Sequence, residues 1–429
     1  MEKATAMLDL KNASVLGPLV EEVEKQIEPV HKAIERTAEY NQYRVLQSFR
    51  RHRVSESHFI PSTGYGYDDY GRETLEAVYA DCFGAESALV RPQIMSGTHA
   101  ITLSLFGVLR PGDELLYITG KPYDTLEKVI GASGDGTGSL RDFGIGFRYV
   151  PLADNGFPDY PTIREAISER TKVIGIQRSR GYADRPSFTI AEIREMIRFV
   201  KEIKEDCIVF VDNCYGEFVE EKEPCHVGAD LIAGSLIKNP GGGIVKTGGY
   251  IAGKKELVEK CANRLASPGI GRKGGATLYS LLEMYQGFFL APHAVSQALK
   301  GAVFTAAVLE KLGMKTNPAW NEKRTDIIQS IQFSDPKRMV SFCQAIQSAS
   351  PVNAHVLPEP SEMPGYSDEV IMAAGTFIQG ASLELTADGP IRPPYIVYMQ
   401  GGLTYEHVKL AVCAALDRLL EQGLASPAR

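Results

Sequence analysis

Two apolar runs, each leading to a charged residue, constrain the fold of this chain more than any other part of its sequence. Residues 208–211 form an apolar, β-branched run, which is typical of a buried strand, and Asp212 follows it directly. A second apolar run, 231–237, leads to Lys238. Asn-Pro-Gly-Gly-Gly comes next and can continue neither a strand nor a helix. The segment therefore predicts an acid and a lysine at the ends of two successive buried strands.

A lysine and an acid in this arrangement suit an enzyme that uses pyridoxal 5'-phosphate. In such enzymes a lysine amine forms a Schiff base with the cofactor, and a carboxylate keeps the pyridine nitrogen protonated so that the ring accepts electrons. Taken singly, a lysine after a strand is usually a surface residue, and an acid there is usually a helix cap. Lys246 is a rival for the Schiff base, but no Gly-Ser strand precedes it. The sequence favours Lys238 with Asp212.

Strands and helices alternate between residues 88 and 252. Apolar strand patterns at 88–90, 114–118 and 173–177 precede the two strands described above. About seven strands in all, separated by helical patterns, predict an α/β fold with a mainly parallel seven-stranded sheet and helices on both faces. Ligands of such sheets bind at the carboxyl ends of the strands, which is where Asp212 and Lys238 fall.

A short polar turn, Ser96-Gly97-Thr98, lies between the first of these strands and a helix that continues to residue 109. A turn of this kind presents backbone N–H groups and hydroxyls to an anion. The same pattern is also a common N-terminal helix cap. Because Ser96 falls at the carboxyl end of a strand, the turn predicts a site for the cofactor phosphate.

The residues around Lys238 resemble those of a known family. The letters GAD at 228–230 and SLIK at 235–238 are similar to the GAD…S-x-T-K segment of the Cys/Met-metabolism branch of fold-type-I pyridoxal phosphate enzymes. That branch includes cystathionine lyases and methionine γ-lyase. Within it, the chain resembles the methionine γ-lyase-like group, also called aluminium-resistance proteins. Ile237 departs from the family's threonine, and three glycines replace its Gly-His run.

The resemblance implies roles for residues outside this segment. The family has a tyrosine that stacks on the pyridine ring, and Tyr123 matches it. In the family, a Tyr-x-Arg segment reaches the cofactor phosphate of a neighbouring subunit. Tyr67 is a loose match to the tyrosine of this segment, and Arg72 is a still looser match to its arginine. The family's asparagine beside the phenolic oxygen of the cofactor is absent here; Arg180 could supply its hydrogen bond or charge instead, or could bind substrate. The implied cofactor-binding residues are Ser96, Gly97, Thr98, Tyr123, Asp212, Ser235, Lys238, Tyr67 and Arg180.

The sequence pattern divides the chain into three parts. Residues 1–55 form a helical arm, in which Pro29 is expected to kink or divide the helix. Residues 56–290 form the cofactor-binding large domain, and residues 291–429 form a smaller α+β domain that includes a linker helix. Fold-type-I enzymes clamp the substrate α-carboxylate with an arginine of the small domain, and Arg392 is the best match. The expected catalytic residues are Lys238, Tyr123 and Arg392.

Composition and charge argue against several functional classes. A net charge of −7 and a pI near 5.7 give no electrostatic basis for binding nucleic acid or anionic membranes. No apolar run approaches a membrane span, and no signal-peptide pattern opens the chain. Seven scattered cysteines suit reduced thiols, so a cytoplasmic protein is expected. No HExxH, paired CxxC, G-x-S-x-G or Walker-type motif is present, so neither a metal site nor a hydrolase site is expected.

The expected activity follows from the resemblance. Lys238 would remove the α-proton of a sulfur amino acid such as cystathionine or methionine, a β- or γ-thiol would leave, and a 2-oxo acid and ammonia would form. A lysine that acts as a base near neutrality needs a lowered pKa. Two alternatives stay open: another pyridoxal phosphate reaction, such as transamination or aldol cleavage, and a protein that binds the cofactor or amino acids without turnover. Since the family shares active sites between subunits, a homo-oligomer, a dimer of dimers, is also expected.

Overall fold

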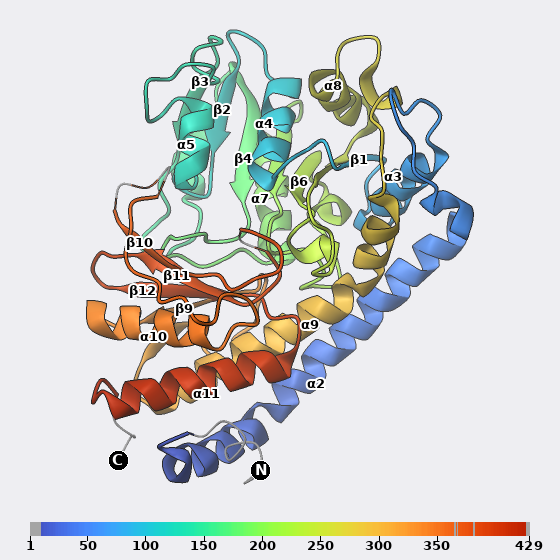
Figure 1. Ribbon diagram of the computed structural model, residues 1–429. Coiled ribbons are helices and arrows are strands. Elements are labelled where there is room, and N and C mark those ends of the chain that lie inside the picture. Colours follow the sequence, from blue (N-terminus) through green and yellow to red (C-terminus); the bar gives the residue numbers. More distant parts are fainter. Residues whose placement is uncertain (1–9, 364–365, 367, 381, 426–429) are drawn as a thin grey trace. The chain divides into compact units, whose positions relative to one another are not determined.

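The computed structural model describes residues 10–363, 366, 368–380 and 382–425 (Figure 1). The chain is divided into two units, which we call the central unit and the terminal unit. The central unit contains Tyr40–Ala291, and the terminal unit combines Met1–Glu39 with Pro292–Arg429. The chain passes from one unit to the other at two points, each within a long helix: α2 (Ala13–Arg51) and α9 (Leu281–Lys311). The terminal unit is therefore built from both ends of the chain.

The central unit is organised around a seven-stranded sheet with the order β1-β7-β6-β5-β4-β2-β3. Strands β3, β2, β4, β5 and β6 run parallel, whereas β7 is antiparallel to both of its neighbours. The mainly parallel seven-stranded sheet that the sequence predicts is thus confirmed. The strands are β1 (Ser87–Arg91), β2 (Glu114–Tyr117), β3 (Gly146–Tyr149), β4 (Thr171–Gln177), β5 (Ile208–Asp212), β6 (Leu231–Ser235) and β7 (Gly249–Gly253).

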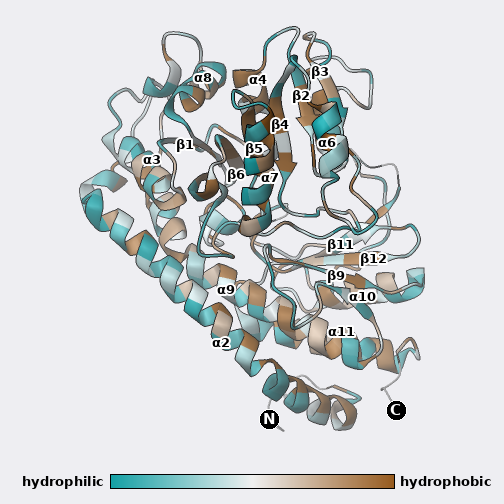
Figure 2. Ribbon diagram, turned by 180° about the vertical axis from the view of Figure 1, so that it is seen from behind, coloured by the Kyte–Doolittle hydropathy of each residue, from teal (hydrophilic) through white to brown (hydrophobic). Residues whose placement is uncertain are grey.

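Helices lie on both faces of this sheet (Figure 1, Figure 2). On one face, α4, α5 and α8 bury apolar side chains against alternate strand residues such as Leu115 and Phe210. On the other face lie α3 and α7, which are seen from behind the sheet in Figure 2. Helix α7 begins with a capping box, in which Thr189 Oγ1 accepts a hydrogen bond from the N–H of Glu192. The helices are α3 (Tyr70–Phe83), α4 (Gly97–Val108), α5 (Asp124–Ile130), α6 (Tyr160–Ala166), α7 (Ile190–Ile203) and α8 (Lys255–Leu265).

The terminal unit contains a five-stranded antiparallel sheet with the order β10-β11-β12-β9-β8. Helices α10 and α11 pack against each other, and α10 also contacts the sheet. Apolar residues from both ends of the chain share one core, in which Leu16 and Val23 of α2 pack with Leu416 of α11. The elements are β8 (Lys315–Asn317), β9 (Ile328–Gln332), α10 (Pro336–Ser348), β10 (Val370–Ala373), β11 (Thr386–Pro390), β12 (Ile396–Gln400) and α11 (Tyr405–Glu421).

Helix α2 continues through both of its prolines, Pro18 and Pro29. The expectation that Pro29 divides this helix is therefore wrong. A proline inside a helix removes one backbone hydrogen bond and crowds the preceding turn. Here the apolar face of α2, which includes Leu16 and Ile27, is buried in the core of the terminal unit. This tertiary packing outweighs the local cost of the proline.

Short 3-10 helices complete the described part of the chain: η1 (Glu56–Phe59), η2 (Pro224–Val227), η3 (Asn239–Gly241) and η4 (Gly271–Lys273). None of the helices in the described residues combines the length and the hydropathy that a membrane-spanning helix needs. All seven cysteines are free thiols.

Candidate active site

Asp212 and Lys238 follow neighbouring strands at one edge of the central sheet. Asp212 is the last residue of β5, and Lys238 lies three residues after the end of β6, where η3 begins. Strands β5 and β6 are parallel, and Asp212 is paired with Ala233. Both side chains are therefore carried at the carboxyl ends of strands. The Lys238 nitrogen lies 3.9 Å from the centre of the Tyr215 ring. The structure thus brings together the acid and the lysine that the sequence singles out.

The buried acid and the half-buried lysine influence each other's charge. Burial raises the pKa of the Asp212 carboxyl group, while Lys238 and the backbone N–H of Cys214, 3.1 Å from Oδ1, oppose that rise. Burial acts to lower the pKa of Lys238, but Cys214, Tyr215 and Asp212 outweigh it, so this pKa lies above its ordinary value. Lys238 is therefore an ammonium ion at neutral pH. The lowered pKa expected of a catalytic base is not found, because Cys214, Tyr215 and Asp212 together outweigh the effect of burial.

The turn Ser96-Gly97-Thr98 opens helix α4, as the sequence predicts. Ser96 is the N-cap residue, and its Oγ accepts a hydrogen bond from the N–H of His99 at 3.0 Å. The first N–H groups of a helix have no partner within the helix, and a capping hydroxyl keeps its own proton. These groups and the helix dipole favour an anion at this position. The turn is chemically suited to hold a phosphate.

Gly97 lies against the strand ends that carry the acid and the lysine. A Cβ atom at Gly97 would lie 3.2 Å from Cys214 Sγ and 3.3 Å from Ser235 Cβ. Ser235 is the last residue of β6 and is buried. The start of α4, the end of β6 and the loop after β5 therefore meet closely. A larger residue at this position would require both neighbours to shift by a few tenths of an ångström.

Tyr123 precedes α5 and lies beside the same turn. Its hydroxyl is 3.2 Å from Thr98 Oγ1, and its backbone N–H donates to Gln177 Oε1 at 3.1 Å. Gln177 is the last residue of β4, so a third strand end fixes the position of this tyrosine. Burial raises the pKa of the Tyr123 hydroxyl, and the charge of Asp212 adds to the rise. The hydroxyl is therefore neutral at physiological pH.

Arg180 lies in the buried segment that follows β4. Its backbone N–H donates to Ser187 Oγ at 3.0 Å. Arg185, which the sequence did not single out, donates to the carbonyl oxygens of Gln177 and Ser179 at 3.1 and 2.7 Å. Its positive charge also opposes the effect of burial on the Asp212 pKa. The role of Arg180 at the cofactor stays a prediction.

Tyr67 and Arg72 occupy different environments. Tyr67 is 51% exposed and stacks on Tyr65, with ring centres 5.3 Å apart. Arg72 is fully buried, and its guanidinium donates to the carbonyl oxygens of Gly66 and Gly275 at 2.6 and 2.7 Å. Arg72 therefore joins two loops of its own chain, in contrast to the expectation that it reaches a phosphate. Tyr67 is accessible, and its role stays a prediction.

The two remaining candidates both form exposed ion pairs. Lys246, the rival for the Schiff base, is 74% exposed and pairs with Glu283. Arg392 belongs to the terminal unit, where it lies 2.9 Å from Asp368 and is half exposed. An exposed ion pair is worth only about 0–1 kcal/mol, so an arginine in such a pair is able to exchange its partner for another carboxylate. The role of Arg392 at a substrate carboxylate stays a prediction.

Tyr215 is a site residue that the sequence reasoning missed. It follows Asp212 by three residues, and its ring faces the amine of Lys238. Its backbone φ of 70° lies in the left-handed region, which is uncommon for a residue other than glycine. A strained backbone of this kind is often found at functional sites. The available signal was an aromatic residue in the short loop directly after the acid.

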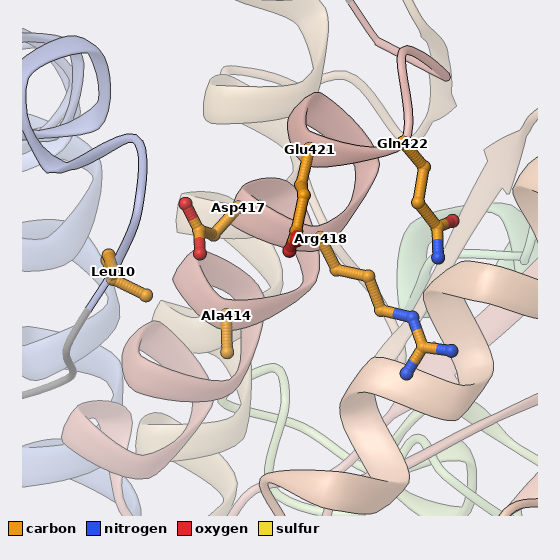
Figure 3. A pocket seen from close by; sticks show the side chains of 6 residues that line it. All are labelled: Leu10, Ala414, Asp417, Arg418, Glu421 and Gln422. Atoms are coloured by element: carbon orange, nitrogen blue, oxygen red, sulfur yellow. The ribbon is translucent and has the colours of Figure 1, made fainter.

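A hollow of about 510 Å³ lies elsewhere, in the terminal unit, and is lined by the six labelled side chains of Figure 3. There Asp417 of α11 accepts hydrogen bonds from the backbone N–H groups of Lys11 and Asn12, at 3.2 and 2.8 Å. These bonds fix the start of α2, so we interpret the hollow as structural. Among the described residues, no group of three or more metal-binding side chains is present.

Comparison with known proteins identifies the family. The profile of the methionine gamma-lyase family matches residues 17–420. The uncharacterized protein YnbB of Bacillus subtilis (strain 168) is 67% identical over 416 residues, which cover 97% of this chain and 99% of that protein. The match therefore extends over both units.

Solved structures agree with this match. A protein of Listeria monocytogenes str. 4b F2365, with the provisional name of cystathionine beta-lyase involved in aluminium resistance, has a TM-score of 0.93 and 64% identity over 94% of this chain and 99% of its own. A carbon-sulfur lyase involved in aluminium resistance from Clostridium novyi NT has a TM-score of 0.92 and 48% identity over 96% and 97%. The pyridoxal-5'-phosphate-dependent protein YhfS of Escherichia coli, 18% identical over 89% and 95% with a TM-score of 0.60, shares the fold. This chain belongs to the methionine gamma-lyase family.

Proposed function

We propose that this protein is a pyridoxal phosphate-dependent carbon–sulfur lyase. Its substrate would be a sulfur amino acid of the cystathionine or methionine type, and its products a thiol, a 2-oxo acid and ammonia. The observation that carries the proposal is the pairing of the buried Asp212 with the half-buried Lys238 beside the start of α4, in a chain of the methionine gamma-lyase family. The name of the Clostridium novyi relative supports the same class of reaction.

The residues present fit the cofactor. Lys238 would hold its aldehyde carbon, Asp212 its ring nitrogen, and the Ser96-Gly97 turn its phosphate. An amine for an electrophile, a carboxylate for a cationic nitrogen and helix N–H groups for an anion match the charges of the cofactor. When bound, pyridoxal phosphate supplies an electron sink that makes the α-hydrogen of an amino acid acidic.

Lys238 Nζ is the atom that would accept the α-proton of the substrate. In this structure Asp212 is the anionic group that helps keep the amine protonated. Asp212 would also hold the ring nitrogen of the cofactor, and this pairing would weaken its effect on the amine and make Lys238 a better base. Tyr123, which Thr98 and Gln177 hold in place, would cover one side of the site. Arg392 would bind the substrate α-carboxylate through its planar fork.

We also propose that the active form is a homo-oligomer. Two adjacent loops of the central unit, joined by the hydrogen bond from the N–H of Leu278 to the carbonyl of Ser62, expose several large apolar side chains. Tyr279 is 84% exposed and Tyr65 is 73% exposed. A concentration of exposed aromatic residues favours a protein–protein interface. Tyr67, beside Tyr65, would then reach the cofactor phosphate of a neighbouring subunit. Light scattering after size-exclusion chromatography should give a mass that is a multiple of the 46.9 kDa chain, and a monomer would refute this part.

Covalent attachment of the cofactor tests the central claim. The protein is incubated with pyridoxal phosphate, reduced with borohydride and digested, and the peptides are examined by mass spectrometry. The wild type should carry the reduced cofactor on Lys238. Lys238→Ala should carry none, whereas Lys246→Ala, the matched control at an exposed lysine, should behave as the wild type does.

Product analysis then tests the reaction. With L-cystathionine, L-methionine and L-cysteine as trial substrates, the thiol (hydrogen sulfide in the case of L-cysteine), the 2-oxo acid and ammonia are measured in parallel. All three products in equal amounts would support a lyase. A 2-oxo acid without a thiol would instead indicate transamination, and bound amino acid without any product would indicate a binding protein. Either of these results would overturn the proposed reaction.

A further inference from the structure

Glu217 is a fully buried acid in the loop after β5. The hydroxyl of Tyr250, on β7, donates to its Oε1 at 2.8 Å. Its Oε2 has no hydrogen-bond partner among the described residues. Ionisation of this carboxyl group would leave a buried, charged oxygen without a hydrogen bond, which is energetically unfavourable. The surroundings therefore favour the neutral acid. Burial accordingly raises the pKa of Glu217 to about 8.

Two hydrogen-bond paths connect Glu217 to the residues next to the proposed cofactor-binding pair. Asn239, which follows Lys238, donates from its side chain to the backbone carbonyl of Glu217 at 2.9 Å. Asn213, which follows the acid at the end of β5, donates to the Tyr250 hydroxyl oxygen at 3.2 Å. That hydroxyl in turn donates to Glu217. Glu217 is therefore tied to both chain segments that would hold the cofactor, to one through its backbone carbonyl and to the other through its carboxyl group.

The space around Glu217 is filled on the side of β6. A Cβ atom at Gly234, which lies one residue before the end of this strand, would be 2.6 Å from Glu217 Oε1 and 2.5 Å from Tyr250 Cε1. The carboxyl group therefore rests almost directly on the backbone of the strand that leads to Lys238.

The surroundings do not stabilise a negative charge on Glu217 well. Glu223, from the loop before η2, is buried and opposes a second charge nearby. Its own carboxylate is already bound by Arg178 at 3.4 Å and by Asn213 at 3.1 Å. Lys238 is a cation that acts to lower the pKa of Glu217, and the proposed function uses it elsewhere. The guanidinium of Arg178, which lies against Gly216, is paired with Glu223. The titratable groups that face Glu217 are Tyr79 of α3, Cys214 after β5, Glu223 before η2, Lys238 after β6 and Tyr250 of β7.

We propose that Glu217 is a positioning residue that works as a neutral carboxylic acid. While it holds its proton, it fixes the segments that end in Asp212 and Lys238. When it loses the proton in alkaline solution, the buried charge disrupts this packing and the affinity for the cofactor falls. The effect on the cofactor rests on the proposed function, but the effect on folding does not.

Thermal unfolding of the cofactor-free protein gives the first test. The folded-state pKa of about 8 lies above the unfolded value of about 4.3, so the folded state binds more protons between these two values. Stability contributed by the neutral acid is therefore complete below about pH 4 and is lost as the pH rises towards 8. Glu217→Gln has no carboxyl group at this position to titrate. The difference between its unfolding temperature and that of the wild type should therefore increase steadily from about pH 5 to about pH 8 and then level off. Infrared spectra at pH 7 should show a protonated carboxyl band that Glu217→Gln reduces.

Cofactor affinity gives the second test. With a pKa of about 8, about nine tenths of Glu217 is protonated at pH 7 and about one tenth at pH 9. If the protonated form is the binding-competent one, the dissociation constant of pyridoxal phosphate should rise about tenfold more in the wild type than in Glu217→Gln over this range. Asp388→Asn is the matched control, because Asp388 is a buried carboxyl group of the terminal unit with a pKa raised to about 7 by burial. This control should keep the tenfold effect.

Specific results would overturn the proposal. If stability and cofactor affinity fall as steeply with rising pH in Glu217→Gln as in the wild type, Glu217 is not the group that causes the loss. Should that variant fail to fold, Tyr250→Phe provides the test: it removes the donor to the carboxylate, so the alkaline loss should move to higher pH, and an unchanged midpoint would contradict the proposal. If none of the proteins binds the cofactor at any pH, the proposed function fails, while the unfolding curves still decide the role of Glu217 in the fold.

Discussion

Replacing Gly234 with alanine tests how tightly β6 is packed behind the site. The new Cβ would lie 2.5 Å from Tyr250 Cε1, whereas carbon atoms in contact are about 3.5–4.0 Å apart. The two carbon atoms would thus be about 1 Å too close. Relieving this clash requires movement of the strand or of the tyrosine ring. That ring is fully buried, and its hydroxyl is bonded to Glu217. Overpacking of this kind costs about 1–3 kcal/mol, so we expect a loss of stability in this range.

Thermal unfolding without cofactor measures this loss. For a unit of this size each kcal/mol lowers the midpoint by about 2–4 °C, so Gly234→Ala should unfold about 2–12 °C below the wild type. Gly146→Ala, in β3, is the matched control. There the new Cβ would be 3.3 Å from Arg170 Nη2, the mobile end of a long side chain. The control should stay within about 0.5 kcal/mol of the wild type.

A double-variant cycle identifies the obstructing group. Tyr250→Leu removes the ring, so adding Gly234→Ala to this variant should cost less than adding it to the wild type. Equal costs in the two backgrounds would show that the ring is not the obstacle. A Gly234→Ala protein that unfolds at the wild-type temperature would refute the reasoning altogether.

Three further expectations follow from other contacts. Glu76→Gln should cost about 3–5 kcal/mol in thermal unfolding, because it breaks the buried ion pair of 2.5 Å with Arg91; a loss below about 1 kcal/mol would contradict this. Burial acts to raise the pKa of Asp69, but hydrogen bonds, including one of 2.6 Å from Thr277, lower this pKa overall. The ionised carboxylate therefore stabilises the folded protein above about pH 4, and this contribution is lost as the pH falls further. Asp69→Asn should therefore flatten the acid side of the stability profile, and an unchanged slope would count against it. Glu384 accepts two backbone N–H bonds, of 2.7 and 2.8 Å, from residues 377 and 378, so Glu384→Gln should speed proteolytic cleavage of this loop, and equal cleavage rates would exclude the effect.

The sequence predicts well those site residues that come directly after a strand. Asp212, Lys238 and Ser96 were placed correctly at the edge of the sheet, because apolar runs closed by Gly and Pro mark where strands stop. In a parallel sheet those ends necessarily face the same edge. Tyr123 was identified by family resemblance, and the structure sets its hydroxyl 3.2 Å from Thr98 Oγ1.

Residues whose position depends on distant backbone could not be predicted. Glu217 lies in an irregular loop, and its environment is created by β7 and by the residue after Lys238. The resemblance matches Arg72 loosely to an arginine that reaches a cofactor phosphate, yet it binds the carbonyl oxygen of Gly275, 203 residues further along the chain. Strand β11 has the sequence Thr-Ala-Asp-Gly-Pro, whose composition is typical of a turn, and only its pairing with β10 and β12 makes it a strand.

The discontinuous core of the terminal unit links the order of folding to the order of synthesis. Leu16 of α2 packs in one cluster with Leu416 of α11, which leaves the ribosome about 400 residues later. At about 5–20 residues per second this interval lasts about 20–80 s. Beyond α2 itself, the earliest member of this cluster along the chain is Val303 of α9, which is translated only after every strand of the central sheet. The apolar face of this first long helix is therefore without its native partners until translation has passed the central sheet, and its core is complete only when α11 has been made.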